Sequence, residues 1–156
     1  MNLRLLLFEE CNRACEGCCN KQWDLMQLPV CGSYDGYDVI MLTGGEPLLR
    51  PDLIRETVAQ IRASSDAQIV LYTARVVGLA EIAPILDGVT LTLHEQSDVV
   101  PFVALSKRMS GGSLRLNVFS NVDITGVDTT GWQVKDEIEW IEDCPLPEDE
   151  VFMRLA

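Results

Sequence analysis

Five short apolar runs alternate along the chain with segments of helical periodicity. The runs lie at residues 3–8, 37–43, 68–73, 89–94 and 114–119. Most of them are nearly continuous in hydrophobic residues, which is typical of parallel strands that are buried on both faces. The pattern therefore predicts five parallel strands joined by helices.

The segments between these runs carry apolar residues at helical spacing. Pro51 opens the first predicted helix, because proline is favoured at the first helical position. The second, over residues 76–86, is shorter, because Pro84 ends or kinks it. The third begins at the Ser-Asp pair of residues 97–98, which can cap it, and ends before the two glycines of residues 111–112.

These units together predict the fold class. Strands spaced by roughly 20–35 residues with a helix between them are typical of right-handed βα crossovers. Five such units are too few to close an eight-stranded barrel, which takes about 250 residues. The sequence thus predicts an α/β fold, a partial, open (βα)5–6 barrel of parallel strands. We expect a single domain over residues 1–156, with a core at about 3–125 and an acidic C-terminal appendage at about 126–156.

Composition narrows the classes of function. The 156 residues include 12 Lys and Arg against 24 Asp and Glu, which gives a net charge of −12. This balance argues against a general binder of nucleic acid, because phosphate contacts come mainly from Lys and Arg. The acidic run over residues 136–150 predicts a solvated surface. No apolar run reaches the ~18–20 residues of a membrane span, so we expect a cytoplasmic protein with no membrane partner.

The cysteines are the first sign of specific chemistry. Four of the six fall within nine residues, and the full set is Cys11, Cys15, Cys18, Cys19, Cys31 and Cys144. In a reducing compartment such a cluster indicates metal or redox chemistry rather than disulfides. The spacing of Cys11, Cys15 and Cys18 lets three thiolates surround one metal centre. A structural zinc site and an ordinary four-iron cluster each take four protein ligands, so three thiolates leave one position open.

The motif Cys-x3-Cys-x2-Cys directly after the first strand resembles that of the radical S-adenosylmethionine (radical SAM) superfamily. The resemblance implies that Cys11, Cys15 and Cys18 bind three irons of a [4Fe–4S] cluster, whose fourth iron chelates SAM. One electron from the cluster then cleaves SAM to a 5′-deoxyadenosyl radical, which abstracts hydrogen from a substrate. The family also implies an electron donor of the flavodoxin or ferredoxin type.

A second motif follows the second predicted strand. Gly44, Gly45, Glu46 and Pro47 match the Gly-Gly-Glu-Pro segment of the same superfamily, which binds SAM. Two glycines let the backbone approach a ligand closely, and Glu46 with nearby backbone groups can accept hydrogen bonds from an ammonium group. Because the motif lies at the carboxyl end of a strand, we expect it on the functional edge of the barrel.

Three further polar residues are candidates for binding SAM. Thr73 and His94 end the third and fourth predicted strands, where the family places side chains that contact SAM. Asn117 alternates with the apolar Leu116 and Val118, so it is expected to face the barrel interior. A purely structural role, as a solvated or hydrogen-bonded residue at a strand end, remains open for all three.

One position departs from the family pattern. The residue before the third cysteine is usually aromatic and packs near the adenine, whereas here it is Gly17. Trp23 or Tyr72 can take that role instead. Cys31 and Cys144 lie far apart in the sequence and do not form the ligand set of an auxiliary cluster. A single cluster is therefore expected.

The sequence leaves the reaction open. The run from Cys15 to Lys21 is similar to that of anaerobic ribonucleotide reductase activating proteins, which implies a glycyl-radical enzyme as partner. The alternative is a radical SAM enzyme that acts on a small molecule, nucleotide or peptide. An iron–sulfur electron carrier or a zinc-stabilised binding module also remains, although the carrier would not need Gly44–Pro47. Basic residues near the expected site (Arg13, Lys21, Arg50 and Arg75) suit a phosphate or carboxylate.

Overall fold

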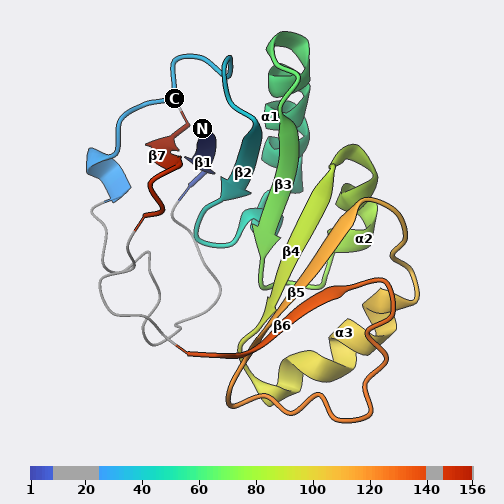
Figure 1. The fold of residues 1–156 in the computed structure, drawn as a ribbon. Helices are drawn as coiled ribbons and strands as arrows, with labels where there is room; N and C mark the ends of the chain where they lie inside the picture. The colour runs from blue at the N-terminus through green and yellow to red at the C-terminus, as the bar shows by residue number, and fades with distance from the viewer. Residues whose placement is uncertain (9–24, 140–145, 156) are drawn as a thin grey trace.

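A computed structural model describes residues 1–8, 25–139 and 146–155 of the chain. It shows an α/β fold built on one seven-stranded, all-parallel sheet (Figure 1). The strands are β1 (Asn2–Leu6), β2 (Val39–Thr43), β3 (Gln68–Thr73), β4 (Gly88–Leu93), β5 (Ser113–Phe119), β6 (Gln133–Ile138) and β7 (Glu150–Arg154). The five strands predicted from the apolar runs are confirmed as β1 to β5.

The strand order is β6-β5-β4-β3-β2-β1-β7. Successive strands from β1 to β6 are neighbours, and β7 returns to pair with β1 rather than with β6. A closed barrel of seven strands in this order would require β6 to pair with β7, and the described residues contain no such pair. The sheet is therefore open between β6 and β7, as expected for a partial barrel.

Within the part of the chain that the structure describes, three α-helices connect the strands. They are α1 (Pro51–Ser64), α2 (Leu79–Ile82) and α3 (Val99–Ser106). The first begins at proline as predicted, and α2 is only one turn long because Pro84 falls in the 3₁₀ turn that follows it. Asp98 is the N-cap residue of α3 as predicted, but its side chain makes no capping hydrogen bond to α3 and instead accepts hydrogen bonds from the backbone that precedes it.

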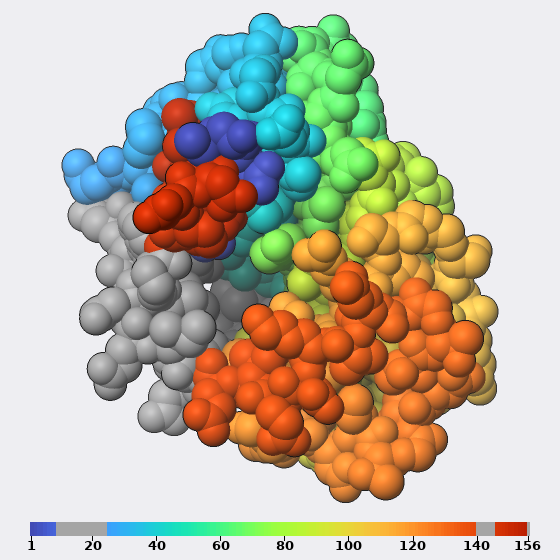
Figure 2. Space-filling model, in the orientation of Figure 1, coloured from blue at the N-terminus to red at the C-terminus, as the bar shows by residue number. Residues whose placement is uncertain are grey.

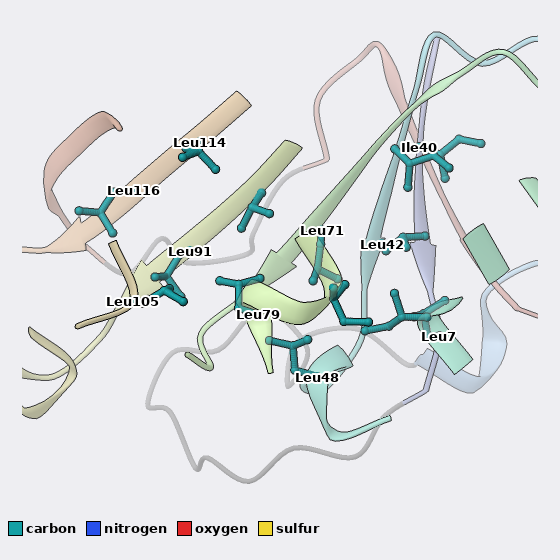
Figure 3. Close-up of a cluster of buried hydrophobic side chains, with 14 of the residues drawn as sticks. Leu7, Ile40, Leu42, Leu48, Leu71, Leu79, Leu91, Leu105, Leu114 and Leu116 are labelled. Atoms are coloured by element: carbon teal, nitrogen blue, oxygen red, sulfur yellow. The ribbon is translucent and has the colours of Figure 1, made fainter. Parts of the chain in front are cut away.

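A single large core lies between the helices and one face of the sheet (Figure 3). Alternate strand residues such as Leu42, Leu71 and Leu91 are fully buried there. They pack in one cluster with Leu79 of α2 and Leu105 of α3. Because side chains of a strand alternate between faces, the residues between them lie on the opposite, concave face of the sheet. That face carries polar residues such as Thr90, Arg115 and Asn117.

The C-terminal region differs from the predicted appendage. Residues 133–138 and 150–154 form β6 and β7, the two edge strands of the sheet. Five of the six residues of β6 are exposed, which removes the apolar run that indicated the other strands. Charged side chains are common on edge strands because they discourage pairing with other chains. The acidic composition of this region therefore made β6 and β7 hard to recognise in the sequence, but it did not prevent them from forming.

Among the helices of the described residues, none has the length and hydrophobicity needed to cross a membrane.

Candidate functional site

The carboxyl ends of β1 to β5 meet at one edge of the parallel sheet, which we call the rim. Gly44 to Pro47 directly follow β2, Thr73 is the last residue of β3, and His94 is the first residue after β4. The structure thus places the predicted Gly-Gly-Glu-Pro segment, Thr73 and His94 along the same edge. Parallel α/β sheets bind ligands at this edge, because the strand-to-helix loops gather there.

The backbone of Phe8 lies against the two glycines. The Gly45 amide donates a hydrogen bond of 2.9 Å to the Phe8 carbonyl, and the Leu7 amide donates one of the same length to Thr43. A Cβ atom at Gly44 would lie 2.8 Å from the Phe8 carbonyl oxygen, closer than real Cβ contacts allow. Gly44 is therefore required for the chain after β1 to approach the chain after β2.

Glu46 is the centre of the hydrogen bonding at the rim. It is buried, with only 3% of its surface exposed. Its Oε1 accepts hydrogen bonds from the Thr73 hydroxyl at 2.5 Å and from the Leu48 amide at 3.1 Å. Its Oε2 accepts one from the Ala74 amide at 3.0 Å. The carboxylate thus joins the end of β2 to the end of β3.

This geometry limits what Glu46 can offer to a ligand. A carboxylate has about four acceptor positions, and three of them are taken by protein donors. At most one acceptor position is left for an ammonium group. Glu46 mainly holds the surrounding backbone in place, through Leu48 and Ala74.

His94 belongs to a second cluster on the rim. The amides of His94 and Glu95 donate to Asp98 Oδ2 at 2.9 and 3.0 Å. The His94 ring stacks on Phe119 at the end of β5, with 4.8 Å between ring centroids. The Asn121 side-chain amide donates to the His94 carbonyl at 3.1 Å. These contacts fix the loop after β4 against the loop after β5.

Asn117 lies on the concave face of the sheet, as predicted. Its neighbours Leu116 and Val118 are buried in the core on the opposite face. In the register of the sheet Asn117 pairs with Thr92 of β4 and with Lys135 of β6. The structure therefore brings Glu46 and Thr73 into contact and places Asn117 two strands away from Thr73.

The three predicted cluster ligands, Cys11, Cys15 and Cys18, lie outside the described residues, and so do Gly17 and Cys144. Within residues 1–8, 25–139 and 146–155, no three His, Cys, Asp or Glu side chains are grouped to hold a metal ion. Cys31 is buried, and its thiol donates to the Ser33 carbonyl. Burial raises the pKa of this thiol, opposed by that hydrogen bond, so Cys31 packs as a neutral side chain.

The described residues on either side of the stretch that holds the three cysteines pack near the end of β1. Before it, Phe8 is bonded to Gly45. After it, Leu25 and Leu28 pack in a small core with Leu6 at the end of β1 and Phe152 of β7. Cys11 follows Phe8 by three residues in the sequence, and three residues of extended chain span at most about 11 Å. The described residues that come directly before and after this stretch therefore both pack near the end of β1.

Two of the four basic residues expected near the site are described. The Arg50 guanidinium lies over the Phe8 ring, 6.0 Å from its centroid, and is 3.8 Å from Asp52. The Nε atom of Arg75, two residues after Thr73, is buried and has no hydrogen-bond partner. Both residues follow strand ends that form the rim, Arg50 after β2 and Arg75 after β3, and so bring positive charge to this edge of the sheet.

Four residues of the rim were not predicted from the sequence. They are Phe8, Ala74, Asp98 and Asn121. The Phe8 carbonyl and the Ala74 amide are backbone groups, which carry no residue-specific signal. The sequence marks Asp98 only as a helix cap, because the sequence does not show whether its side chain bonds to the helix that follows or to the backbone that precedes it. The sheet alone brings Asn121 beside His94, 27 residues earlier in the sequence.

Comparison with known proteins gives a partial match. No family model matches the chain. Over 103 residues it is 31% identical to molybdenum cofactor biosynthesis protein 1 of Bos taurus, covering 58% of this chain and 16% of that protein. It is 30% identical over 103 residues to the Homo sapiens protein of the same name, with the same coverage. The chain is thus similar to a part of these relatives and spans about a sixth of their length.

Proposed function

We propose that the chain is a radical SAM enzyme, which binds one [4Fe–4S] cluster through Cys11, Cys15 and Cys18 and binds SAM at the rim. One observation carries the proposal: Phe8, just before the cysteine motif, is hydrogen-bonded to Gly45 of the Gly-Gly-Glu-Pro motif. The residue that comes three positions before Cys11 in the sequence is thus in contact with the second motif, which supports a shared site for the two. The partial identity to molybdenum cofactor biosynthesis protein 1 supports the superfamily over part of the chain.

The residues present fit the proposed cofactors. Three thiolates leave one iron without a protein ligand, so that a small molecule can bind there. When bound, the cluster would supply the electron that cleaves SAM. The chain's own residues do the rest: Glu46 holds the ends of β2 and β3 together, and the close approach at Gly44 keeps the backbone of the motif next to Phe8. Arg50 and Arg75 offer positive charge to a carboxylate.

The substrate of this enzyme is proposed to be a small molecule. The relatives are named for the biosynthesis of a cofactor, which favours this reading over a protein substrate. The resemblance of Cys15 to Lys21 to activating proteins is the observation in favour of a glycyl-radical enzyme. An external electron donor of the flavodoxin or ferredoxin type is part of either proposal.

The experiment is anaerobic reconstitution of the full chain with iron and sulfide, followed by SAM and dithionite and an assay for 5′-deoxyadenosine. We expect a four-iron spectrum and product, both lost when Cys11, Cys15 or Cys18 is changed to Ala. Cys31→Ala is the matched control and should keep both, because Cys31 is buried and bonded to Ser33.

A full cluster in all three cysteine variants would contradict the proposal. So would a cluster in the unchanged protein that never cleaves SAM, which would favour an electron carrier. Zinc in place of iron in the native protein would favour a binding module.

A further inference from the structure

The concave face of the sheet contains a cavity of about 310 Å³ that the rim residues do not use. It is lined by β1 to β5 and by the chain that enters β7. Small-molecule sites have volumes of about 300–1,000 Å³, so the cavity suits a ligand at the small end of that range. Figure 2 shows the surface hollowed between the red atoms of β7 and the orange part of the chain that contains β5 and β6.

Three side chains with ligand-binding chemistry lie side by side across this cavity. In the parallel register Tyr72 of β3 pairs with Thr90 of β4, and Thr90 pairs with Arg115 of β5. Register partners of a parallel sheet point to the same face, and all three residues line the cavity. An aromatic ring, a hydroxyl and a guanidinium are therefore arranged in one row.

Thr90 has an unusual environment. It is only 4% exposed, and its hydroxyl oxygen is buried with no hydrogen-bond partner. A buried polar group without a partner costs roughly 1–3 kcal/mol, so native structures rarely keep one. Since Thr90 lines the cavity, a ligand in the cavity can supply the missing partner.

The charges around the cavity favour a negatively charged ligand at the Arg115 end. Asp87 is paired with Arg62 at 2.8 Å, and Glu150 is paired with Arg4 at 3.2 Å. Within the described part of the chain, Arg115 has no acidic partner. The remaining acid of the lining, Asp149, is exposed to solvent just before β7.

We propose that this cavity binds a small ring-bearing molecule through a carboxylate or phosphate group, which Arg115 pairs with and to which the Thr90 hydroxyl donates. Arginine is suited to this role because its planar donor pairs match both oxyanions. Tyr72 provides a surface for the ring. Much of the lining belongs to the first residues of strands, such as Asn2, Val39 and Ser113, so the cavity lies away from the rim at the carboxyl ends. The proposed ligand is therefore a molecule other than SAM. The binding itself does not depend on SAM cleavage.

The test uses the reconstituted full chain and three matched probes: benzoate, phenyl phosphate and the neutral benzyl alcohol. Binding is measured by saturation-transfer NMR with titration, first without SAM and then with saturating SAM. We expect at least one of the two anions to bind roughly tenfold more tightly than the alcohol, as a charge-assisted hydrogen bond implies. Whichever of benzoate and phenyl phosphate binds more tightly then shows whether the natural ligand carries a carboxylate or a phosphate.

Variants separate a binding role from a structural one. Arg115→Gln and Thr90→Val should each weaken the preferred anion several-fold, whereas Arg115→Lys and Thr90→Ser should restore part of the binding. Asp149→Asn should leave the affinity for the preferred anion unchanged or increase it, because the substitution removes a negative charge. Circular dichroism of each variant checks that the fold is intact.

Three results would overturn the proposal: equal binding of the alcohol and both anions, displacement of the probes by SAM, or loss of binding in Asp149→Asn. Failure of SAM cleavage with retained anion binding would instead count against the proposed function alone.

Discussion

At the scale of single residues, Glu46 connects the Gly-Gly-Glu-Pro motif to the rest of the rim. Its carboxylate accepts hydrogen bonds from Leu48, Thr73 and Ala74 and is nearly fully buried. The sequence identified Glu46 and Thr73 separately, one from its motif and the other from its place at a strand end. That they bind each other follows only from the pairing of β2 with β3.

This arrangement predicts that Glu46 contributes to stability as well as to SAM binding. Glu46→Ala leaves three donors without their acceptor, so the free energy of unfolding should fall by about 1–3 kcal/mol. SAM affinity should also weaken, while the cluster is retained. Urea unfolding of the full chain and SAM titration of the reconstituted protein measure the two effects.

Thr73 provides the matched comparison for Glu46. Thr73→Val removes one donor and should lower the free energy of unfolding by about 1 kcal/mol, while Thr73→Ser keeps the hydroxyl and should cost less. If Glu46→Ala changed neither the free energy of unfolding nor the SAM affinity, the hydrogen bonds of Glu46 would contribute neither to stability nor to SAM binding.

At the scale of elements, Asp87 joins three parts of the fold just before β4. Its Oδ2 accepts hydrogen bonds from Arg62 of α1 and from the Ile69 amide of β3, both at 2.8 Å. Its carbonyl accepts one from the Ser113 amide at the start of β5. Burial alone would raise the pKa of Asp87, but the hydrogen bonds from Ile69 and Arg62 and the Arg62 charge outweigh it, so the pKa is lowered.

The lowered pKa fixes the sign of a pH dependence. A carboxylate whose pKa is lower in the folded state stabilises the fold above its unfolded pKa, here near 3.8, and loses this effect as the pH falls through the folded value. Asp87→Asn should therefore lower the free energy of unfolding by about 1 kcal/mol at pH 7. The difference from the unchanged protein should shrink below about pH 4.

Urea unfolding of the cluster-free chain at several pH values tests this. Asp66→Asn is the control. Asp66 is exposed and its side chain has no hydrogen bond or ion pair within the described structure, so this change should have little effect. An effect of Asp87→Asn that is constant down to pH 3 would contradict the assigned role of the carboxylate.

The elements also show where sequence patterns succeed. The strands β1 to β5 were predicted because one face packs on the helices and the other curves inward, so their runs are nearly continuously apolar. The strands β6 and β7 were not, because they lie at the edges, where one side of the strand has no neighbour in the sheet. Because five of the six residues of β6 are exposed, charged side chains stand where the other strands have apolar ones.

At the scale of the whole molecule, β7 brings the C-terminal end of the chain beside its N-terminal end. It pairs with β1 over five residues, and on its other side Arg154 exchanges hydrogen bonds with the backbone of Pro29 and Cys31. Phe152 fills the small core with Leu6, Leu25 and Leu28. The chain after the cysteine motif is thus packed against the last strand.

Replacing the Phe152 side chain by a smaller one should therefore destabilise the whole fold. Phe152 is 7% exposed, and loss of a buried phenylalanine side chain typically costs about 3–5 kcal/mol. Phe152→Ala should lower the free energy of unfolding by that amount in a urea titration. Met26→Ala, at a side chain that is 59% exposed, should stay within about 0.5 kcal/mol of the unchanged protein. Equal effects of the two changes would argue against β7 as a stabilising strand.

The sequence by itself determined the α/β class, five of the seven strands, and two motifs whose order resembles that of radical SAM proteins. These follow from local causes: periodic burial of apolar side chains, proline and glycine at element ends, and the ligand chemistry of cysteine. The tertiary structure decided that Phe8 meets Gly45, that Glu46 bonds to β3, that β7 joins β1, and that Tyr72, Thr90 and Arg115 share a cavity. These contacts join residues far apart in the chain, so only the pairing of strands and the curvature of the sheet bring them together.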